Sequence, residues 1–328
     1  MEDLGRLKYN TAPGLGGLRN EHITALKLNP RRIMTPSASV VLDHYFSYSV
    51  AVMKVELPLW FYEVESAVRL VPANKVDPRE LPPNMTPDAR PVGVGTAERR
   101  HRERVYYDTP TIASFNIITA PIQNGVGLKA GMTISVFAAQ AQMEAAPGHE
   151  VHKKDLMNGY NEVKRSSVME ELTAQESLEG LYAYTHAMLT PMSFIGMGSG
   201  TNLTAAPFRS EEGLQQGAVP SGYLFTLGCN KAYQRANRDL NMVGGAMFAI
   251  IDDHYLQGPP RSLLEVNTNL ALDLAEVGLT VRNDKSQAYV RADFLSPDAA
   301  HWRDGIPASC WFCPALQPLY GRGDQVPV

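Results

Sequence analysis

Two adjacent aspartates, Asp252 and Asp253, follow an apolar run in the segment GGAMFAIIDDHYL. The run has the length of a buried strand, which predicts a tight turn at the two acids and a return strand over HYL. Neighbouring like charges repel each other, and a divalent cation at the turn would offset that repulsion because Mg²⁺ prefers oxygen ligands. Paired acids are also common in solvated turns, so the pair alone does not indicate a metal site.

Asp155 is the candidate for a further ligand. It ends EVHKKD, a predicted strand over 150–155, and the following LMNGYNEVKR predicts a strand-to-helix transition. If the two strands lie side by side, Asp155 comes near Asp252 and Asp253. Three carboxylates can hold two Mg²⁺ or Mn²⁺ ions about 3.5–4 Å apart, a geometry that supports in-line phosphoryl transfer.

Helices and strands must position these acids. Apolar spacing predicts helices within 37–65, over 131–146, from about residue 161 past residue 187, and after Pro220. Strands that alternate with helices, with acids at the strand ends, indicate an α+β or α/β fold.

The segment after the hairpin has the clearest helical pattern. Ser262 and Glu265 have the spacing of a capping box, and Gly278 is a typical helix stop. The apolar residues between them fall on one helix face. They are Leu263, Val266, Leu270, Leu274 and Val277.

The composition is that of an ordinary folded protein. The chain has 328 residues, enough for one large domain or two, and a formal net charge of -4, which does not indicate a nucleic-acid binder. The chain still contains arginines and lysines that could contact a nucleic-acid backbone. They are Arg99, Arg100, Arg102, Arg104, Lys129, Lys153, Lys154, Lys164 and Arg165. No apolar run is long enough to cross a membrane, and three cysteines favour a reducing, intracellular setting, nucleus or cytoplasm.

Seven segments stand in the order found in one enzyme family, from about residue 11 to residue 290. They read TAPGLGGLRNEHITAL, RLVPANK with RPVGVGTAERR, PIQNGVGLKAG, DLMNGYNEVKR, EEGLQQGAVPSGYLF, AIIDD and GLTVRNDK. Together they resemble a reverse transcriptase, an RNA-directed DNA polymerase, of the kind carried by non-LTR retroelements and group II introns. Ile250 stands where that family usually has Tyr or Phe.

The resemblance implies an α+β fold with the fingers and palm of a right-hand polymerase. Fingers would span 1–130, and a palm with an antiparallel sheet backed by helices would span 131–292. The tail, 293–328, carries no thumb-like pattern, so the thumb is expected to be absent or truncated. The chain would then belong to a larger polyprotein with further domains.

The resemblance also implies roles at the catalytic centre. Asp155, Asp252 and Asp253, with the backbone carbonyl of Leu156, would bind the metal ions. Tyr160 would lie beneath the sugar of the incoming nucleotide and exclude a 2′-hydroxyl, which favours deoxynucleotides. A tyrosine at this position is equally compatible with a place in a helix core.

Further residues would bind the nucleotide and the template. Lys75 and Arg90 would reach the triphosphate, and Lys285 would donate a proton to the leaving pyrophosphate. Gln216 and Gly217 would open the helix behind the base, although Gly217 also suits a simple helix-entry turn. The expected partners are dNTPs, an RNA template and a DNA or RNA primer, with no membrane.

Other readings stay open. The first is a degenerate or domesticated palm that binds RNA or a protein without catalysis. The second is a nucleotide-binding enzyme of another class, because GVGLKAG imitates a glycine-rich turn, although no strand and acid complete a βαβ unit. A zinc site at Cys310 and Cys313 would have only Cys229 as a further cysteine ligand.

Overall fold

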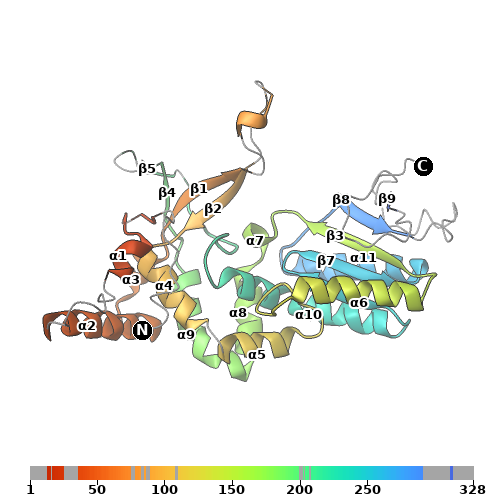
Figure 1. The fold of residues 1–328 in the computed structure, drawn as a ribbon, viewed down its shortest axis with the longest axis horizontal. Helices are drawn as coiled ribbons and strands as arrows, with labels where there is room; N and C mark the ends of the chain where they lie inside the picture. Colours follow the sequence, from red (N-terminus) through yellow and green to blue (C-terminus); the bar gives the residue numbers. More distant parts are fainter. Residues whose placement is uncertain are drawn as a thin grey trace. The chain divides into compact units, whose positions relative to one another are not determined.

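The structure, a computed structural model, divides into two compact units (Figure 1). One unit comprises Met1–Thr111 and Gln175–Ser221, and the other comprises Ile112–Ala174 and Gly222–Val328. Each unit is therefore built from two separate stretches of chain. The residues that the structure describes are 13–15, 17–25, 36–74, 78–82, 85, 89–107, 110–198, 202, 204–206, 208–290 and 311–312.

The first unit contains helices and a small sheet. Its helices are α1 (Asn20–Thr24), α2 (Pro36–Met53), α3 (Leu59–Glu65), η2 (Pro78–Glu80), α4 (Ala97–Tyr106), η3 (Glu176–Leu178) and α9 (Glu179–Leu189). Its strands are β1 (Val68–Asn74), β2 (Ala89–Val94), β4 (Ile195–Met197) and β5 (Thr204–Ala205). Among the described residues the sheet order is β2-β1-β4-β5, with β1 antiparallel to β2 and parallel to β4.

Aromatic side chains fill one core of this unit. Tyr62 and Tyr184 are buried against Val52, and the Tyr62 hydroxyl donates a hydrogen bond of 2.9 Å to the Val52 carbonyl. A buried hydroxyl needs such a partner, because an unpaired one costs about 1–3 kcal/mol. The apolar spacing within 37–65 therefore forms the two helices α2 and α3, whose inner faces share this core.

The second unit combines helices with a sheet that is mostly antiparallel. Its helices are α5 (Pro110–Thr119), α6 (Gly131–Ala145), α7 (Gly159–Glu162), α8 (Arg165–Thr173), α10 (Ser221–Asn241) and α11 (Pro260–Glu276). Its strands are β3 (Glu150–Leu156), β6 (Ala246–Ile250), β7 (Asp253–Gly258), β8 (Val281–Tyr289) and β9 (Trp311–Phe312). In the described residues the order is β6-β7-β3-β8-β9, and only the short β8–β9 pair is parallel.

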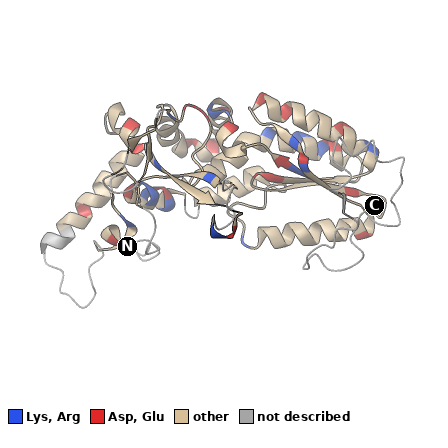
Figure 2. Ribbon diagram, turned by 90° about the horizontal axis from the view of Figure 1, so that it is seen from above, with Lys and Arg blue, Asp and Glu red and all other residues tan. Residues whose placement is uncertain are grey.

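Helices cover both faces of this sheet (Figure 2). On one face Asn267 of α11 hydrogen-bonds the ring of His152 at 3.0 Å, and Asn237 of α10 accepts the Met247 amide at 2.9 Å. On the other face Ala139 of α6 packs against Val151. The sequence predicts helices over 131–146 and after Pro220, and α6 and α10 confirm both.

Two expectations about helices are wrong in detail. The stretch from residue 161 past residue 187 is not one helix, because Val163 and Lys164 are extended, with ψ of 128° at each. The capping box at Ser262 does not form, because α11 begins earlier, at Pro260. Proline suits the first helical turn, where its missing N–H has no partner to lose.

The other expectations for α11 hold except at Val277, which is the partly buried C-cap residue and not part of the helix face. Leu263, Val266, Leu270 and Leu274 are buried on one face, and Gly278 follows the helix with φ of +87°. Glycine adopts this left-handed conformation without a steric cost, so it ends the helix cleanly.

Within the described ranges, none of the helices combines the length and the hydropathy that a membrane span requires.

Candidate functional site

The paired aspartates lie at the β6–β7 hairpin, but the turn comes one residue earlier than the sequence predicts, because Asp253 already belongs to β7. Ile250 pairs with Asp253, which leaves Ile251 and Asp252 as a two-residue turn. Ile251 has φ of +59°, a conformation that β-branched residues rarely adopt. Strain of this kind costs about 1–3 kcal/mol and persists only where surrounding contacts hold it, often at functional sites.

Strand β3 brings Asp155 to the same end of the sheet. Lys153 pairs with Tyr255 and Lys154 with His254, so one further step of the same register sets Asp155 beside Asp253. Directly paired residues of neighbouring strands point to the same face. Asp155 and Asp253 therefore lie at the same end of the sheet and on the same face.

Lys153 is the nearest cation to these carboxylates among the described ion pairs. Its Nζ lies 3.0 Å from the Asp253 Oδ1 and 5.9 Å from the centroid of the Tyr255 ring. By contrast, the Asp155 carboxylate has no hydrogen bond or ion pair within the described part of the chain. Asp253 thus pairs with a lysine, and Asp155 interacts electrostatically with Arg282, its partner across the β3–β8 pair.

Asp252 acts electrostatically on the aromatic side of the hairpin. Burial raises the pKa of Tyr160, and the charge of Asp252 adds to that rise. Burial likewise raises the pKa of the Cys229 thiol to about 12, with a smaller contribution from Asp252. The charge of Asp252 thus adds to the effect of burial at Tyr160 and Cys229, while Asp253 pairs with Lys153.

The donor set suits a hard divalent cation. Asp155, Asp252, Asp253 and the carbonyl of Leu156 offer only oxygen ligands, which Mg²⁺ and Mn²⁺ prefer. Across the described ranges, however, no three acidic, histidine or cysteine side chains lie close enough together to hold a metal ion. Lys153 would compete with a metal ion for Oδ1 of Asp253.

Tyr160 lies on α7, directly after the end of β3. Its ring stacks on Phe225 with centroids 5.0 Å apart and planes at 29°. Gly159 permits this contact, because a Cβ there would come within 3.2 Å of the Phe225 ring. The ring is thus held from behind by α10, an arrangement compatible both with a rigid wall beneath a sugar and with a core tyrosine.

Lys285 lies in a strand near Asp155. It is exposed on β8, inside an irregular stretch between the pairs Asp155–Arg282 and Lys153–Gln287. Such an irregularity re-aims side chains at a strand end. The structure therefore brings Asp155, Asp252, Asp253, Leu156, Tyr160 and Lys285 into the same unit.

The remaining substrate-binding candidates belong to the other unit. Arg90 is exposed on β2, opposite Ala73. Gln216 and Gly217 form a turn before α10, and the Gln216 carbonyl accepts the Gly93 amide at 2.8 Å. Lys75 lies outside the described residues, as do Cys310 and Cys313.

Gly217 is required by its backbone. Its φ is +107°, and a Cβ would lie 2.7 Å from Cγ1 of Val92. The glycine therefore lets the turn pack closely against β2. Gln216 and Gly217 precede α10 rather than opening it, because the helix begins at Ser221.

Two of the four arginines of α4 are buried, which corrects their expected role. Arg99 and Arg102 are 5% and 3% exposed. Arg99 donates to Glu103 at 2.8 Å, and Arg102 pairs with Glu65. Buried charges survive only when paired in this way. These two arginines therefore stabilise the unit and cannot reach a nucleic-acid backbone; Lys154 and Arg165 are buried as well.

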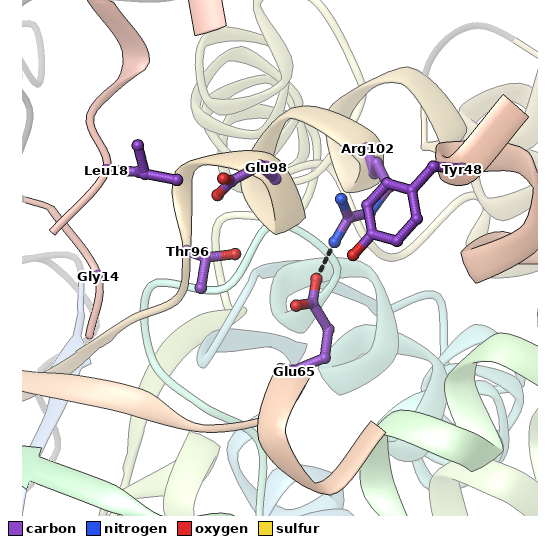
Figure 3. Close-up of a pocket in the computed structure, with 7 residues that line it drawn as sticks. All are labelled: Gly14, Leu18, Tyr48, Glu65, Thr96, Glu98 and Arg102. Atoms are coloured by element: carbon purple, nitrogen blue, oxygen red, sulfur yellow. Dashed lines mark hydrogen bonds and ion pairs between the residues drawn. The ribbon is translucent and has the colours of Figure 1, made fainter. Parts of the chain in front are cut away.

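A pocket of about 180 Å³ adjoins this ion pair (Figure 3). Its lining residues are Gly14, Leu18, Tyr48, Glu65, Thr96, Glu98 and Arg102. The Arg102 guanidinium lies over the Tyr48 ring, 5.3 Å from its centroid. The pocket thus lies beside a paired charge in the first unit, and the hairpin acids belong to the second.

Sequence reasoning missed Gln123 as a residue of the site. It occurs in PIQNG, a segment quoted for its resemblance, and its side chain contacts the turn at Ile251. The PIQNG motif could have drawn attention to Gln123. However, no spacing rule predicts a contact between Gln123 and a turn 128 residues away in the sequence.

No protein-family model matches the chain, and no curated protein matches it.

Proposed function

We propose that the protein is an RNA-directed DNA polymerase of the reverse transcriptase type, joining dNTPs to a primer 3′-hydroxyl. The observation that supports this best is the meeting of β3 with the β6–β7 hairpin, which gathers Asp155, Asp252 and Asp253 at one end of an antiparallel sheet. The motif order in the sequence adds independent support.

Each residue has a defined task in this proposal. Asp155, Asp252 and Asp253 hold Mg²⁺ or Mn²⁺, which when bound lowers the pKa of the attacking hydroxyl and neutralises phosphate charge. Tyr160, backed by Phe225, blocks space for a 2′-hydroxyl.

The exposed cations act on the triphosphate. Lys285 gives a proton to the leaving pyrophosphate, and Arg90 pairs with phosphate oxygens through its planar guanidinium. The proposed substrates are an RNA template and a DNA or RNA primer, with retroelement copying as the biological setting.

Primer extension on poly(rA)/oligo(dT) with Mg²⁺ or Mn²⁺ tests the proposal. Wild type should extend the primer, and Asp252→Asn should lose at least about a hundredfold in rate, because a ligand of the transition-state charge is gone. Asp239→Asn, the same change on α10 away from the hairpin, should extend like wild type. Absence of extension by wild type with either ion would refute the proposal.

A second candidate is a palm that binds RNA without catalysis. The Lys153–Asp253 ion pair favours it, because a lysine already neutralises one of the acids. This candidate predicts salt-sensitive RNA binding by wild type and Asp252→Asn alike, without extension by either. Filter binding at several salt concentrations distinguishes it from the polymerase.

A further inference from the structure

A short segment lies along the free edge of the catalytic hairpin. Ala249 of β6 donates its amide to the Ile122 carbonyl at 2.8 Å, and its own carbonyl accepts the Asn124 amide at 2.9 Å. Gln123 and Ala249 thereby form a parallel bridge. The edge strand β6 thus gains a backbone partner next to the strained turn.

The side chain of Gln123 contacts the strained residue directly. Its Oε1 accepts the Ile251 amide at 2.9 Å and the Gly125 amide at 2.9 Å. Its Nε2 donates to the Ile251 carbonyl at 3.4 Å. Two backbone donors at one atom require an oxygen there, which fixes the orientation of the amide.

One buried amide therefore satisfies both backbone groups of Ile251. Gln123 is 5% exposed, so water does not replace these bonds readily. Gly125 makes the approach possible, because a Cβ there would lie 2.7 Å from the Ile251 nitrogen and 2.8 Å from the Ile250 Cα.

We infer that Gln123 is a positioning residue, which holds the Ile251 peptide at positive φ and thereby fixes where Asp252 and Asp253 present their carboxylates. The inference rests on the proposed function for its catalytic consequence. Asp252 follows Ile251 directly. If Ile251 relaxed to an ordinary negative φ, the peptide that joins it to Asp252 would rotate and the Asp252 carboxylate would move.

The chain offers a matched set of variants. Gln123→Met keeps the side-chain length and removes all three hydrogen bonds. Gln123→Glu keeps the acceptor for the two amides and loses the donor to the Ile251 carbonyl. Gln234→Met is the control, because Gln234 of α10 donates to the Ala120 carbonyl at 3.0 Å and does not contact the turn.

Amide hydrogen exchange tests the hydrogen bonds between Gln123 and the hairpin turn, here called the Gln123 clamp, and does not depend on enzymatic activity. In Gln123→Met the Ile251 and Gly125 amides should exchange at least about tenfold faster, because both lose their hydrogen bond to Oε1 of Gln123, and Gln123→Glu should be intermediate. Gln234→Met should leave these amides unchanged. Unchanged exchange in Gln123→Met, or equal acceleration throughout the unit, would overturn the inference.

Primer extension then tests the catalytic consequence. Gln123→Met should lower kcat by about tenfold or more with KM for the dNTP within about twofold, because positioning acts on the transition state. A tenfold loss in Gln234→Met as well would overturn the assignment. If the wild type shows a protected Ile251 amide but no primer extension, the proposed polymerase function is refuted, whereas the structural role of Gln123 at the turn is supported.

Discussion

Lys153 and Asp253 form the contact that most directly opposes metal binding at the hairpin. The ion pair is partly exposed, with side chains 25% and 38% accessible, so solvent screens it and its contribution is small. Lys153→Met should free Asp253 and raise Mn²⁺ affinity about two- to fivefold, the range for exposed ion pairs.

Mn²⁺ titration followed by electron paramagnetic resonance measures this change. Lys129→Met, which removes an exposed lysine from another segment, is the matched control and should leave the affinity unchanged. A lower affinity in Lys153→Met would mean that the lysine supports the site instead of competing with the metal.

Tyr160 and Phe225 set the expected sugar selectivity. Tyr160→Ala should increase ribonucleotide incorporation relative to deoxynucleotide by about tenfold or more, because the ring no longer occupies the space of a 2′-hydroxyl. Phe225→Leu should shift selectivity in the same direction by less, since Tyr160 then loses its stacking partner.

Competition between dNTP and rNTP in primer extension reads out the ratio. Tyr160→Phe keeps the ring and is the control. Unaltered selectivity in Tyr160→Ala would identify Tyr160 as a core tyrosine.

At the level of elements, the turn before α10 depends on Gly217. Gly217→Ala introduces a Cβ at φ of +107° and 2.7 Å from Val92, so it should destabilise the first unit by about 1–3 kcal/mol. Gly180→Ala on α9 is the control in the same unit, because its Cβ meets only the Tyr106 hydroxyl at 3.9 Å. Thermal melting should show a lower Tm for Gly217→Ala alone; equal Tm values would contradict this account of the turn.

The same scale shows what the sequence could predict. Apolar periodicity correctly predicted the buried face of α11, because this helix buries one regular face. The length of the apolar run predicted β6, and the expected turn after it predicted the return strand β7. Periodicity failed at Val163 and Lys164, where two extended residues interrupt a helical pattern that has no glycine or proline to mark the break. It also could not find that Arg102 is buried, because its partner Glu65 is 37 residues away in the sequence and is brought to it only by the fold.

For the whole molecule, burial of His254 links stability to pH. Burial, together with the charge of Lys154, lowers the pKa of His254 to about 3, so the folded protein keeps this ring neutral. An unfolded histidine has a pKa of about 6.5 and binds a proton below that value, so the unfolded state gains stability as pH falls from about 6.5 toward 3.

Acid sensitivity should therefore decrease in His254→Phe. Between about pH 6 and 4 its Tm should fall less steeply than that of wild type, because the buried base is gone. His44→Gln on α2 changes an exposed histidine and should keep the wild-type slope. Parallel slopes for wild type and His254→Phe would show that other groups dominate acid unfolding.

The most direct test of the central claim is whether Asp155 and Asp252 act as one catalytic centre. The measurement is the single-turnover primer-extension rate of wild type, Asp155→Asn, Asp252→Asn and the double variant. Residues that act as a unit lose most activity with the first change, so the double variant should be no more than about tenfold slower than either single variant. Additive losses, or a single variant that retains the wild-type rate, would contradict the account.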